Sequence, residues 1–311
     1  MPGVVGWRPL GIMRRRMKRA PAFLLATLAL AACNAGALFA TPTTTAPPPT
    51  ATSTPEPLAA SVNGQGILLS DFEDEVARFE AAQAVLGTDL ASLGDYRTQV
   101  LEALIDRVLL AQGAVAEGKE VDAEAVESEV ETLVEVRGGS EAMGAWMAEN
   151  RYTLDSFKQA LRQDMLSAMM VEAIDRDVGE TAEQVRAAHI LVASHEEADG
   201  LSAELAAGAD FGDLARASSL DPSSRPAGGD LGWFPAGYLL VPEVGGAAWE
   251  LAPGETSDVI ESALGYHIVR VLERGEHTLS PDARRFLRER AVREWLQARR
   301  DVAAIETYAV P

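Results

Sequence analysis

Hydrophobic residues between positions 60 and 180 recur every three or four residues, which is the repeat of an amphipathic helix. Four stretches carry this repeat, and their apolar positions in chain order are Phe72, Val76 and Phe79; Val100, Leu101, Leu104, Ile105, Val108 and Leu109; Val126, Val130, Leu133 and Val134; and Leu154, Phe157, Leu161, Met165 and Met169. Ser70 and Glu73 have the spacing of a capping box, which predicts the start of the first helix. Gly113 or Gly118 predicts the end of the second helix. The pattern therefore predicts an all-helical region over residues 59–180.

Met165, Met169 and Met170 lie close together on the fourth stretch. A methionine stripe at helical spacing is usually part of a core, which is the interpretation we favour. The alternative is an adaptable groove for peptides, because the flexible thioether side chain fills irregular spaces.

The repeat changes near residues 180–186. Short β-like runs at 187–193 and 266–272 enclose helical and turn-rich segments, which predicts a small α/β domain over residues 181–275. Helix returns after Arg274, with Ser280 as N-cap and Pro281 at the first helical position. Its apolar stripe contains Leu287, Ala291, Trp295, Ala298, Val302 and Ile305. We expect this C-terminal helix, within residues 276–311, to pack on the helical region and complete it, which predicts an α+β chain with the α/β domain inserted.

The first 32 residues have the pattern of a secretory signal. A basic stretch, Arg14–Arg19, precedes a short apolar run, Ala20–Ala32, and the chain could start at Met13 or Met17. About 20 apolar residues are needed to span a bilayer, so this run is short for a permanent membrane helix.

The only cysteine, Cys33, directly follows Leu30-Ala31-Ala32. This arrangement resembles the bacterial lipobox, and the resemblance implies that Cys33 is lipid-modified and becomes the first residue of the mature chain. The alternative is a free or buried thiol behind an ordinary signal peptide. A single cysteine cannot form an intrachain disulfide.

Residues 33–58 are rich in Ala, Thr and Pro and cannot bury a core, so we expect an extended tether. The 311 residues, 47% of them hydrophobic, are enough for about two domains with their own cores. The whole chain has a net charge of −20, with 27 basic and 47 acidic residues. Residues 1–32 contribute six basic residues and no acidic one, which leaves 21 basic against 47 acidic residues, or −26, in the rest. Such a surface repels phosphate backbones, so we expect no nucleic-acid partner.

Two of the four histidines lie on the β-like runs that enclose the α/β domain. The relevant segments read His189-Ile-Leu-Val, Gly228-Gly-Asp-Leu-Gly-Trp-Phe234 and Gly265-Tyr-His-Ile-Val269. Their order resembles that of the parvulin family of peptidyl-prolyl isomerases, over residues 183–274. The resemblance implies that His189 and His267 face each other on neighbouring strands and that Asp221 completes a catalytic polar group. Without it, a histidine on an apolar strand is more often a core residue, and the two histidines could also serve chiefly to hold the fold.

Isomerisation of an X-Pro bond requires no metal, cofactor or covalent nucleophile, and we expect none. The catalyst must grip the proline ring and favour the twisted amide over the planar one, which faces a barrier near 18–20 kcal/mol. By resemblance, the apolar pocket should be formed by Leu231, Phe234, Leu240 and Val244. The position of Val244 is commonly phenylalanine in the family, so either activity is reduced or Trp249 or Phe234 covers the ring instead.

The opening Val62-Asn-Gly-Gln, followed by Ser70-Asp-Phe, resembles the N-terminal part of PrsA/SurA-type foldases. That resemblance implies a lipid-anchored isomerase and chaperone on the extracytoplasmic face of the cell membrane, with newly exported or unfolded polypeptides as partners. The anchor would be its only contact with the membrane, and a homodimer is left open. The acidic stretch Ser194–Gly200, which we interpret as a loop, predicts no preference for phosphorylated substrates.

Two other functions compete with this interpretation. The first is a non-catalytic peptide-binding holdase whose parvulin domain has lost turnover, as the substitution at Val244 suggests. The second is the solute-binding lipoprotein of a transporter, which would need two α/β lobes where this chain has one small unit.

Overall fold

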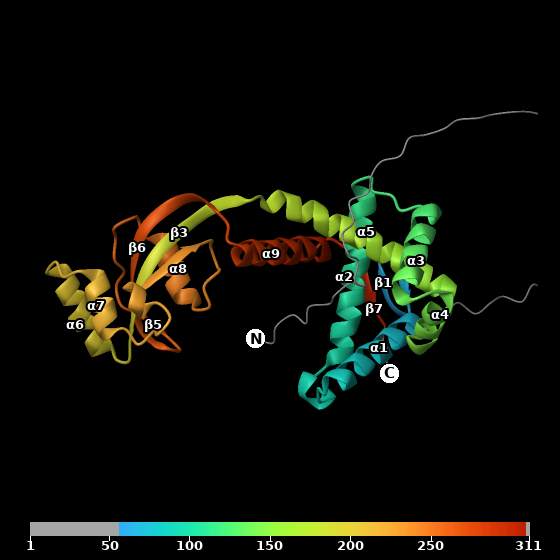
Figure 1. The fold of residues 1–311 in the computed structure, drawn as a ribbon, viewed down its shortest axis with the longest axis horizontal. Coiled ribbons are helices and arrows are strands. Elements are labelled where there is room, and N and C mark those ends of the chain that lie inside the picture. Colours follow the sequence, from blue (N-terminus) through green and yellow to red (C-terminus); the bar gives the residue numbers. More distant parts are fainter. Residues whose placement is uncertain (1–55, 309–311) are drawn as a thin grey trace, which may run out of the picture. The chain divides into compact units, whose positions relative to one another are not determined.

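The computed structural model describes residues 56–308. Its first part contains β1 (Leu58–Val62), β2 (Gln65–Leu68), α1 (Leu69–Leu86), α2 (Tyr96–Ala116), α3 (Ala123–Arg137), α4 (Ser140–Glu149) and α5 (Leu154–Val178). An α/β unit follows, with β3 (Thr181–Val192), α6 (His195–Ala206), α7 (Phe211–Ser218), β4 (Asp230–Phe234), α8 (Pro242–Glu250), β5 (Ile260–Ser262) and β6 (Gly265–Thr278). The chain then forms α9 (Pro281–Arg300) and β7 (Ile305–Thr307) (Figure 1). Short 3₁₀ helices occupy Leu90–Leu93 and Arg225–Ala227. The predicted α+β class, with the α/β unit inserted between helical segments, is confirmed.

The first part together with α9 and β7, which we call the helical part, is not entirely helical. A three-stranded sheet in the order β2-β1-β7 lies within it. β1 and β2 form a hairpin around Asn63 and Gly64, a dipeptide that favours a two-residue hairpin turn. The prediction of an all-helical region is corrected accordingly, because these strands are too short to show a clear alternation of polar and apolar residues.

Two further predictions for the helical part were wrong in detail, and one helix was missed. Ser70 does not cap α1, because the helix begins at Leu69 and Leu68 is its N-cap, without a side-chain hydrogen bond. The sequence pattern also missed α4, which contains one buried side chain, Met143. The predicted stripe of the last helix extends too far: α9 ends at Arg300, Val302 is exposed and Ile305 belongs to β7.

The C-terminal segment completes the core of the helical part, as the apolar stripe predicted. Leu296, Ala303 and Ile305 pack against buried side chains of β1, α1 and α2. The Trp295 ring lies so close to Gly113 of α2 that a Cβ atom at position 113 would come within 2.5 Å of it. Gly113 therefore lies inside α2, where it makes room for α9, and the helix continues to Ala116.

Arg300 joins the end of α9 to α2 through two carboxylates. Its Nε atom donates to Asp106 Oδ1 at 2.7 Å, and its guanidinium also contacts Glu102. We expect Arg300→Met to lower the free energy of unfolding by about 1–2 kcal/mol, because it leaves Asp106 partly buried without its partner. Urea unfolding of the chain measures this. Arg285→Met is the matched control on the same helix, since Arg285 is 69% exposed and its ion pair is with neighbouring Asp282. Equal stability of both variants would contradict the prediction.

The α/β unit is a four-stranded antiparallel sheet in the order β4-β3-β6-β5, with helices on both faces. α6 and α7 cover one face, where Ala188, Ile190 and Ile268 are buried. α8 covers the other face through the α8 cluster, which we define as the buried residues Val185, Ala187, Phe234, Val244, Ala248, Val269 and Val271. β3 thus supplies alternate residues to two cores, as expected of a central strand.

The stretch Ser194–Gly200 was predicted as a loop, but most of it is the first turns of α6. Ser194 and Glu197 form a reciprocal capping box: the Ser194 hydroxyl accepts from the Glu197 amide, and the Glu197 carboxylate accepts from the Ser194 amide. Negative charge is favourable at a helix N-terminus, so the acidic residues here stabilise the helix.

Within residues 56–308, none of the helices has the length and hydropathy needed to cross a bilayer. The predicted signal peptide, Cys33 and nearly all of the tether lie outside the described residues.

Candidate active site

The two histidines lie diagonally opposite each other on the central strand pair. In the antiparallel register His189 of β3 faces Val269 of β6, and His267 faces Leu191, so both histidines project from the same side of the sheet. Their rings are nearly parallel, with centroids 5.6 Å apart and Nδ1 atoms at 3.4 Å. His267 is fully buried and His189 is 8% exposed. The structure therefore brings together the pair that the sequence predicted.

Asp221 is held against His189 by the turn that follows α7. Its Oδ2 atom lies 2.8 Å from His189 Nε2 and also accepts a short hydrogen bond from the Ser224 hydroxyl. Its Oδ1 atom accepts from the amide and hydroxyl of Ser223. Burial alone would raise the pKa of Asp221, but the hydrogen bonds from Ser223, Ser224 and His189 outweigh burial and lower the pKa well below its ordinary value. Asp221 is therefore an anion at neutral pH.

Ser262, at the end of β5, completes the group on the far side of His267. Its hydroxyl lies 2.7 Å from His267 Nε2. With Asp221 ionised, one arrangement of protons is consistent with the contacts between these side chains: Ser262 donates to His267, His267 Nδ1 donates to His189 Nδ1, and His189 Nε2 donates to Asp221. We call Ser262, His267, His189, Asp221 and Ser224 the histidine network.

Sequence reasoning missed both serines of the network. Ser224 follows Asp221 by three residues, a spacing typical of side-chain hydrogen bonds in turns, and this signal could have found it. No comparable signal marks Ser262, because its position depends on the β5–β6 turn that folds it back onto His267.

Burial lowers the pKa of His267, and the neighbouring His189 acts in the same direction, against the weaker attraction of Glu243 and Asp221. The unfolded chain therefore binds more protons than the folded chain once the pH falls below about 6.5. We expect the α/β unit to lose stability between pH 7 and 5 through this group. Asp221, whose pKa is lowered, contributes stability that is lost only below about pH 4. Unfolding free energies across this range measure both effects, and a His267→Gln variant with the same slope between pH 7 and 5 would contradict the assignment.

The segment Gly228–Phe234, which we call the glycine signature, fixes the edge of the site on β3. Gly229 adopts a φ of +84°, and its carbonyl accepts from the His189 amide at 2.9 Å. A Cβ atom at position 229 would lie 2.3 Å from the His189 carbonyl oxygen. Next to it, Asp230 binds Arg186 of β3 with a shortest distance of 2.6 Å. The signature therefore holds the backbone of β4 against the residues that flank His189.

The predicted pocket residues have different environments. Phe234 and Val244 are almost fully buried in the α8 cluster, at 1% and 2% exposure, whereas Leu231 and Trp249 pack half-buried on its edge. Val244 thus occupies a core position, where its side chain, smaller than the phenylalanine expected there, is enclosed by its neighbours. The predicted role of these four residues in binding a proline ring stays a prediction.

Leu240 lies at the surface, outside the α8 cluster. Its side chain is 99% exposed, while the preceding residue, Leu239, packs on the α8 cluster. A Cβ atom at Gly245 of α8 would lie 3.6 Å from Leu239, so the glycine in α8 leaves space beside this leucine. Of these two neighbouring leucines, Leu239 is the one that packs on the α8 cluster, and a role of Leu240 in binding substrate stays a prediction.

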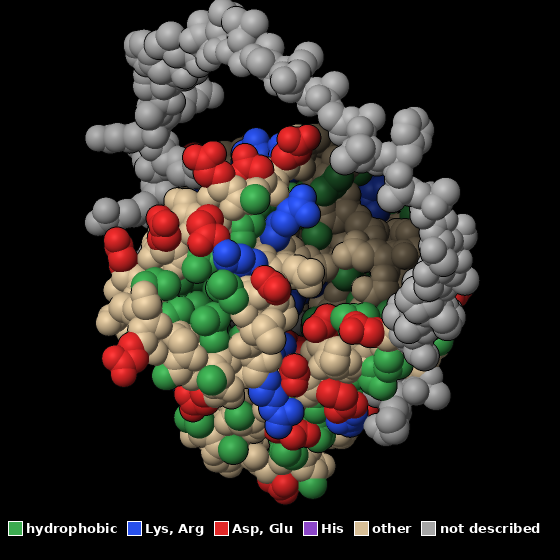
Figure 2. Space-filling model, turned by 90° about the vertical axis from the view of Figure 1, so that its right-hand side faces the viewer, with side chains coloured by type: hydrophobic (Ala, Val, Ile, Leu, Met, Phe, Trp, Pro, Cys, Tyr) green, Lys and Arg blue, Asp and Glu red, His purple; other side chains and the backbone are tan. Residues whose placement is uncertain are grey.

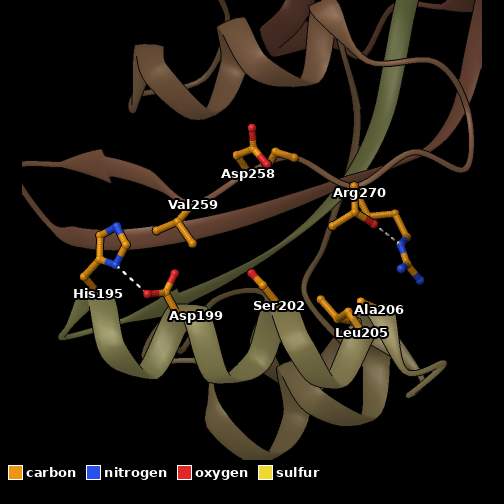
Figure 3. A pocket seen from close by; sticks show the side chains of 10 residues that line it. His195, Asp199, Ser202, Leu205, Ala206, Asp258, Val259 and Arg270 are labelled. Carbon is orange, nitrogen blue, oxygen red and sulfur yellow. Dashed lines mark hydrogen bonds and ion pairs between the residues drawn. The ribbon is translucent and has the colours of Figure 1, made fainter.

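A hollow of about 530 Å³ lies on the α6 side of the sheet, away from the histidine network. Its lining comes from α6, from residues 256–259 and from Arg270, and Figure 3 shows the His195–Asp199 contact at its rim. None of the predicted site residues lines it, so it is not the site described above. Within residues 56–308 there is also no group of three or more His, Cys, Asp or Glu side chains placed to hold a metal ion.

Comparison with known proteins agrees with this geometry. Residues 10–171, more than half of the chain, match the family model of the SurA-like N-terminal domain. The chain belongs to this family. Residues 169–275, which include the whole histidine network, match the PPIC-type PPIase domain. The resemblance to parvulin-type, PrsA/SurA-like proteins is therefore confirmed.

Curated relatives of the chain include foldase proteins named PrsA. The foldase protein PrsA of Geobacillus sp. (strain WCH70) is 30% identical over 182 residues, covering 57% of this chain and 64% of the relative. PrsA of Bacillus subtilis (strain 168) is 35% identical over 138 residues, covering 42% of this chain and 47% of the relative. The chain thus spans less than two thirds of the length of these relatives. A crystal structure of peptidylprolyl isomerase (PrsA) from Bacillus anthracis aligns with 65% of this chain and 95% of its own, at 26% identity and a TM-score of 0.41.

Proposed function

We propose that the chain is a peptidyl-prolyl cis-trans isomerase that also holds unfolded polypeptides. The observation that carries the proposal is the histidine network, which continues from an anionic Asp221 through two stacked histidines and lies on the same sheet face as the α8 cluster. An apolar cluster beside preorganised polar groups suits a reaction in which a proline ring is gripped while its amide twists. No group in the network needs to form a covalent bond.

A protease-coupled assay with an Xaa-Pro tetrapeptide tests this activity in the chain itself. We expect acceleration of cis-to-trans conversion well above the uncatalysed rate, which corresponds to tens of seconds. No acceleration would contradict the proposal and favour the second candidate, a peptide-binding holdase without turnover. That candidate is favoured by one observation: Leu240, predicted as a pocket wall, contacts nothing in the α8 cluster.

The helical part supports the holding function. Its exposed large hydrophobic side chains are Val85, Leu86, Val115, Val136, Leu154, Val302 and Tyr308. Figure 2 views the molecule from the side of α3 and α4, and acidic side chains are spread over this face with hydrophobic ones in groups between them. Small exposed apolar patches on an acidic surface suit weak binding of unfolded chains. Suppression of aggregation of an unfolding protein by the chain, in the absence of isomerase turnover, measures this function.

We further propose that Cys33 carries a lipid that anchors the protein on the extracytoplasmic face of the cell membrane. The support is the lipobox-like Leu30-Ala31-Ala32-Cys33 behind a basic and apolar leader. Metabolic labelling with a radioactive fatty acid in a bacterial host should label the wild-type chain and leave Cys33→Ser unlabelled. Labelling of both or of neither would contradict the anchor. Sedimentation of the unlipidated chain tests the homodimer that the sequence left open.

Phosphorylated substrates should have no advantage. Glu196 and Glu197 lie at the start of α6, directly after the strand that carries His189, and like charge repels a phosphate. We expect matched Ser-Pro peptides with and without phosphate to be isomerised with similar kcat/KM. A strong preference for the phosphopeptide would overturn this prediction.

A further inference from the structure

The segment between β4 and α8 forms one side of the α8 cluster. It begins with a turn in which the Tyr238 amide donates to the Pro235 carbonyl and Gly237 has a φ of +75°. These are the features of a type II turn, which needs a left-handed residue at its third position. After the turn, Tyr238, Leu239 and Val241 pack on the α8 cluster. The position of this turn therefore decides where three cluster side chains lie.

α9 holds this turn from outside the α/β unit. The Arg290 guanidinium donates to the Ala236 carbonyl at 2.6 Å, and the Phe286 ring meets Tyr238 edge-on, with centroids 5.5 Å apart. A Cβ atom at Gly237 would be 3.7 Å from Arg290 and 3.8 Å from Phe286. Tyr238 packs both on the α8 cluster and on a second cluster formed by Leu279, Ala283 and Leu287. The turn thus lies between α9 and the α8 cluster.

The same helix is fixed in the helical part at its other end. Trp295 lies against Gly113, Leu296 packs on the core of the helical part, and Arg300 binds the carboxylates of α2. One continuous helix therefore contacts the core of the helical part and the turn that borders the α8 cluster.

We propose that Arg290 and Phe286 are positioning residues for isomerisation, which hold the 235–241 turn so that the proline-binding side of the α8 cluster is formed before substrate arrives. This inference rests on the proposed function and deepens it, since it makes α9 of the helical part a component of the isomerase site. A preformed apolar site does not have to be ordered at the moment of binding, so its affinity for the substrate and for the transition state is higher.

The test compares variants of the complete chain. Arg290→Ala should lower kcat/KM for an Xaa-Pro peptide about tenfold, mainly by raising KM, because the turn must then be ordered by the substrate. Arg290→Lys keeps a donor for a single carbonyl and should restore most of the activity. Glu294→Gln is the matched control, since it removes the ion pair of Arg290 with Glu294 and leaves the bond to Ala236 intact. Phe286→Leu removes the ring contact with Tyr238 and should act in the same direction as Arg290→Ala.

Hydrogen exchange of the amides at 237–240 supplies a second readout that is independent of turnover. Exchange should be faster in Arg290→Ala and unchanged in Glu294→Gln, while suppression of aggregation stays at the wild-type level. Unchanged exchange or unchanged kcat/KM in a folded Arg290→Ala variant would overturn the inference. A wild-type chain without isomerase activity would instead refute the proposed function. This result is distinguishable from unchanged exchange or unchanged kcat/KM in Arg290→Ala.

Discussion

Replacing Gly229 with alanine should unfold the α/β unit while the helical part keeps its structure. The added Cβ atom would lie 2.3 Å from the His189 carbonyl oxygen and 3.2 Å from Ala215, on a backbone with a φ of +84°. The atom it meets at 2.3 Å is backbone of the central strand, so no side chain can move aside to accommodate it. We expect a loss on the order of 4 kcal/mol or more, because a non-glycine residue in this conformation adds strain to a steric overlap in the core.

Gly232 provides a control within the same signature. Its φ is +72°, but a Cβ atom there would meet nothing within 4 Å. Gly232→Ala should therefore cost only about 1 kcal/mol, the strain of the left-handed backbone alone. Amide NMR spectra of the two variants measure the difference: Gly229→Ala should lose the dispersed signals of the α/β unit and Gly232→Ala should keep them. Two equally folded variants would show that the close approach of β4 to His189 is not required.

Replacing Asp221 with alanine should give the largest loss of activity in a folded chain. Without this carboxylate, His189 Nε2 and the Ser224 hydroxyl lose their common partner, and nothing fixes the proton arrangement of the two histidines. We expect kcat/KM to fall on the order of 100-fold, as is typical when a group that preorganises a polar site is removed.

A graded series of variants separates this effect from loss of stability. Ser223 donates to the carboxylate oxygen that does not contact His189, so Ser223→Ala should have a small effect on kcat/KM. Ser224→Ala removes a donor to the oxygen that binds His189 and should lie between the two. Asp213→Ala is the control for a lost carboxylate, because Asp213 is 78% exposed and forms an ion pair with nearby Arg216. Equal activity of Asp221→Ala and Asp213→Ala would mean that the network takes no part in turnover.

The sequence was sufficient to predict the features that depend on residue order and local repeat. The α+β class, the insertion of the α/β unit and the packing of the last helix on the first part followed from hydrophobic periodicity. The association of His189, His267 and Asp221 was implied by the resemblance of the ordered motifs to the parvulin family. Predictions of this kind tolerate an error of a residue or two at the ends of an element. The apolar pattern repeats along the whole helix or strand, so the type of element and its buried face are still predicted correctly.

Features that depend on the path of the chain in the folded structure, rather than on a local pattern, could not be predicted. β7 has only three residues and is defined by its pairing with β1, from the opposite end of the chain. Ser262 joins the network only because a tight turn returns it to His267. That Leu239 rather than Leu240 packs on the α8 cluster depends on the path of the chain after the turn at Pro235–Tyr238, which a local pattern does not contain.

The rate of cis–trans exchange of an Xaa-Pro peptide, measured by exchange NMR with catalytic amounts of the chain, tests the central claim most directly. This measurement needs no coupling protease and reports turnover at the prolyl bond itself. We expect the wild-type chain and Gly232→Ala to accelerate exchange between the cis and trans signals of the peptide. The rate in the presence of Asp221→Ala should be lower on the order of 100-fold. Exchange at the uncatalysed rate in the presence of the wild-type chain, folded as described, would contradict the claim that the histidine network and the α8 cluster form an isomerase site.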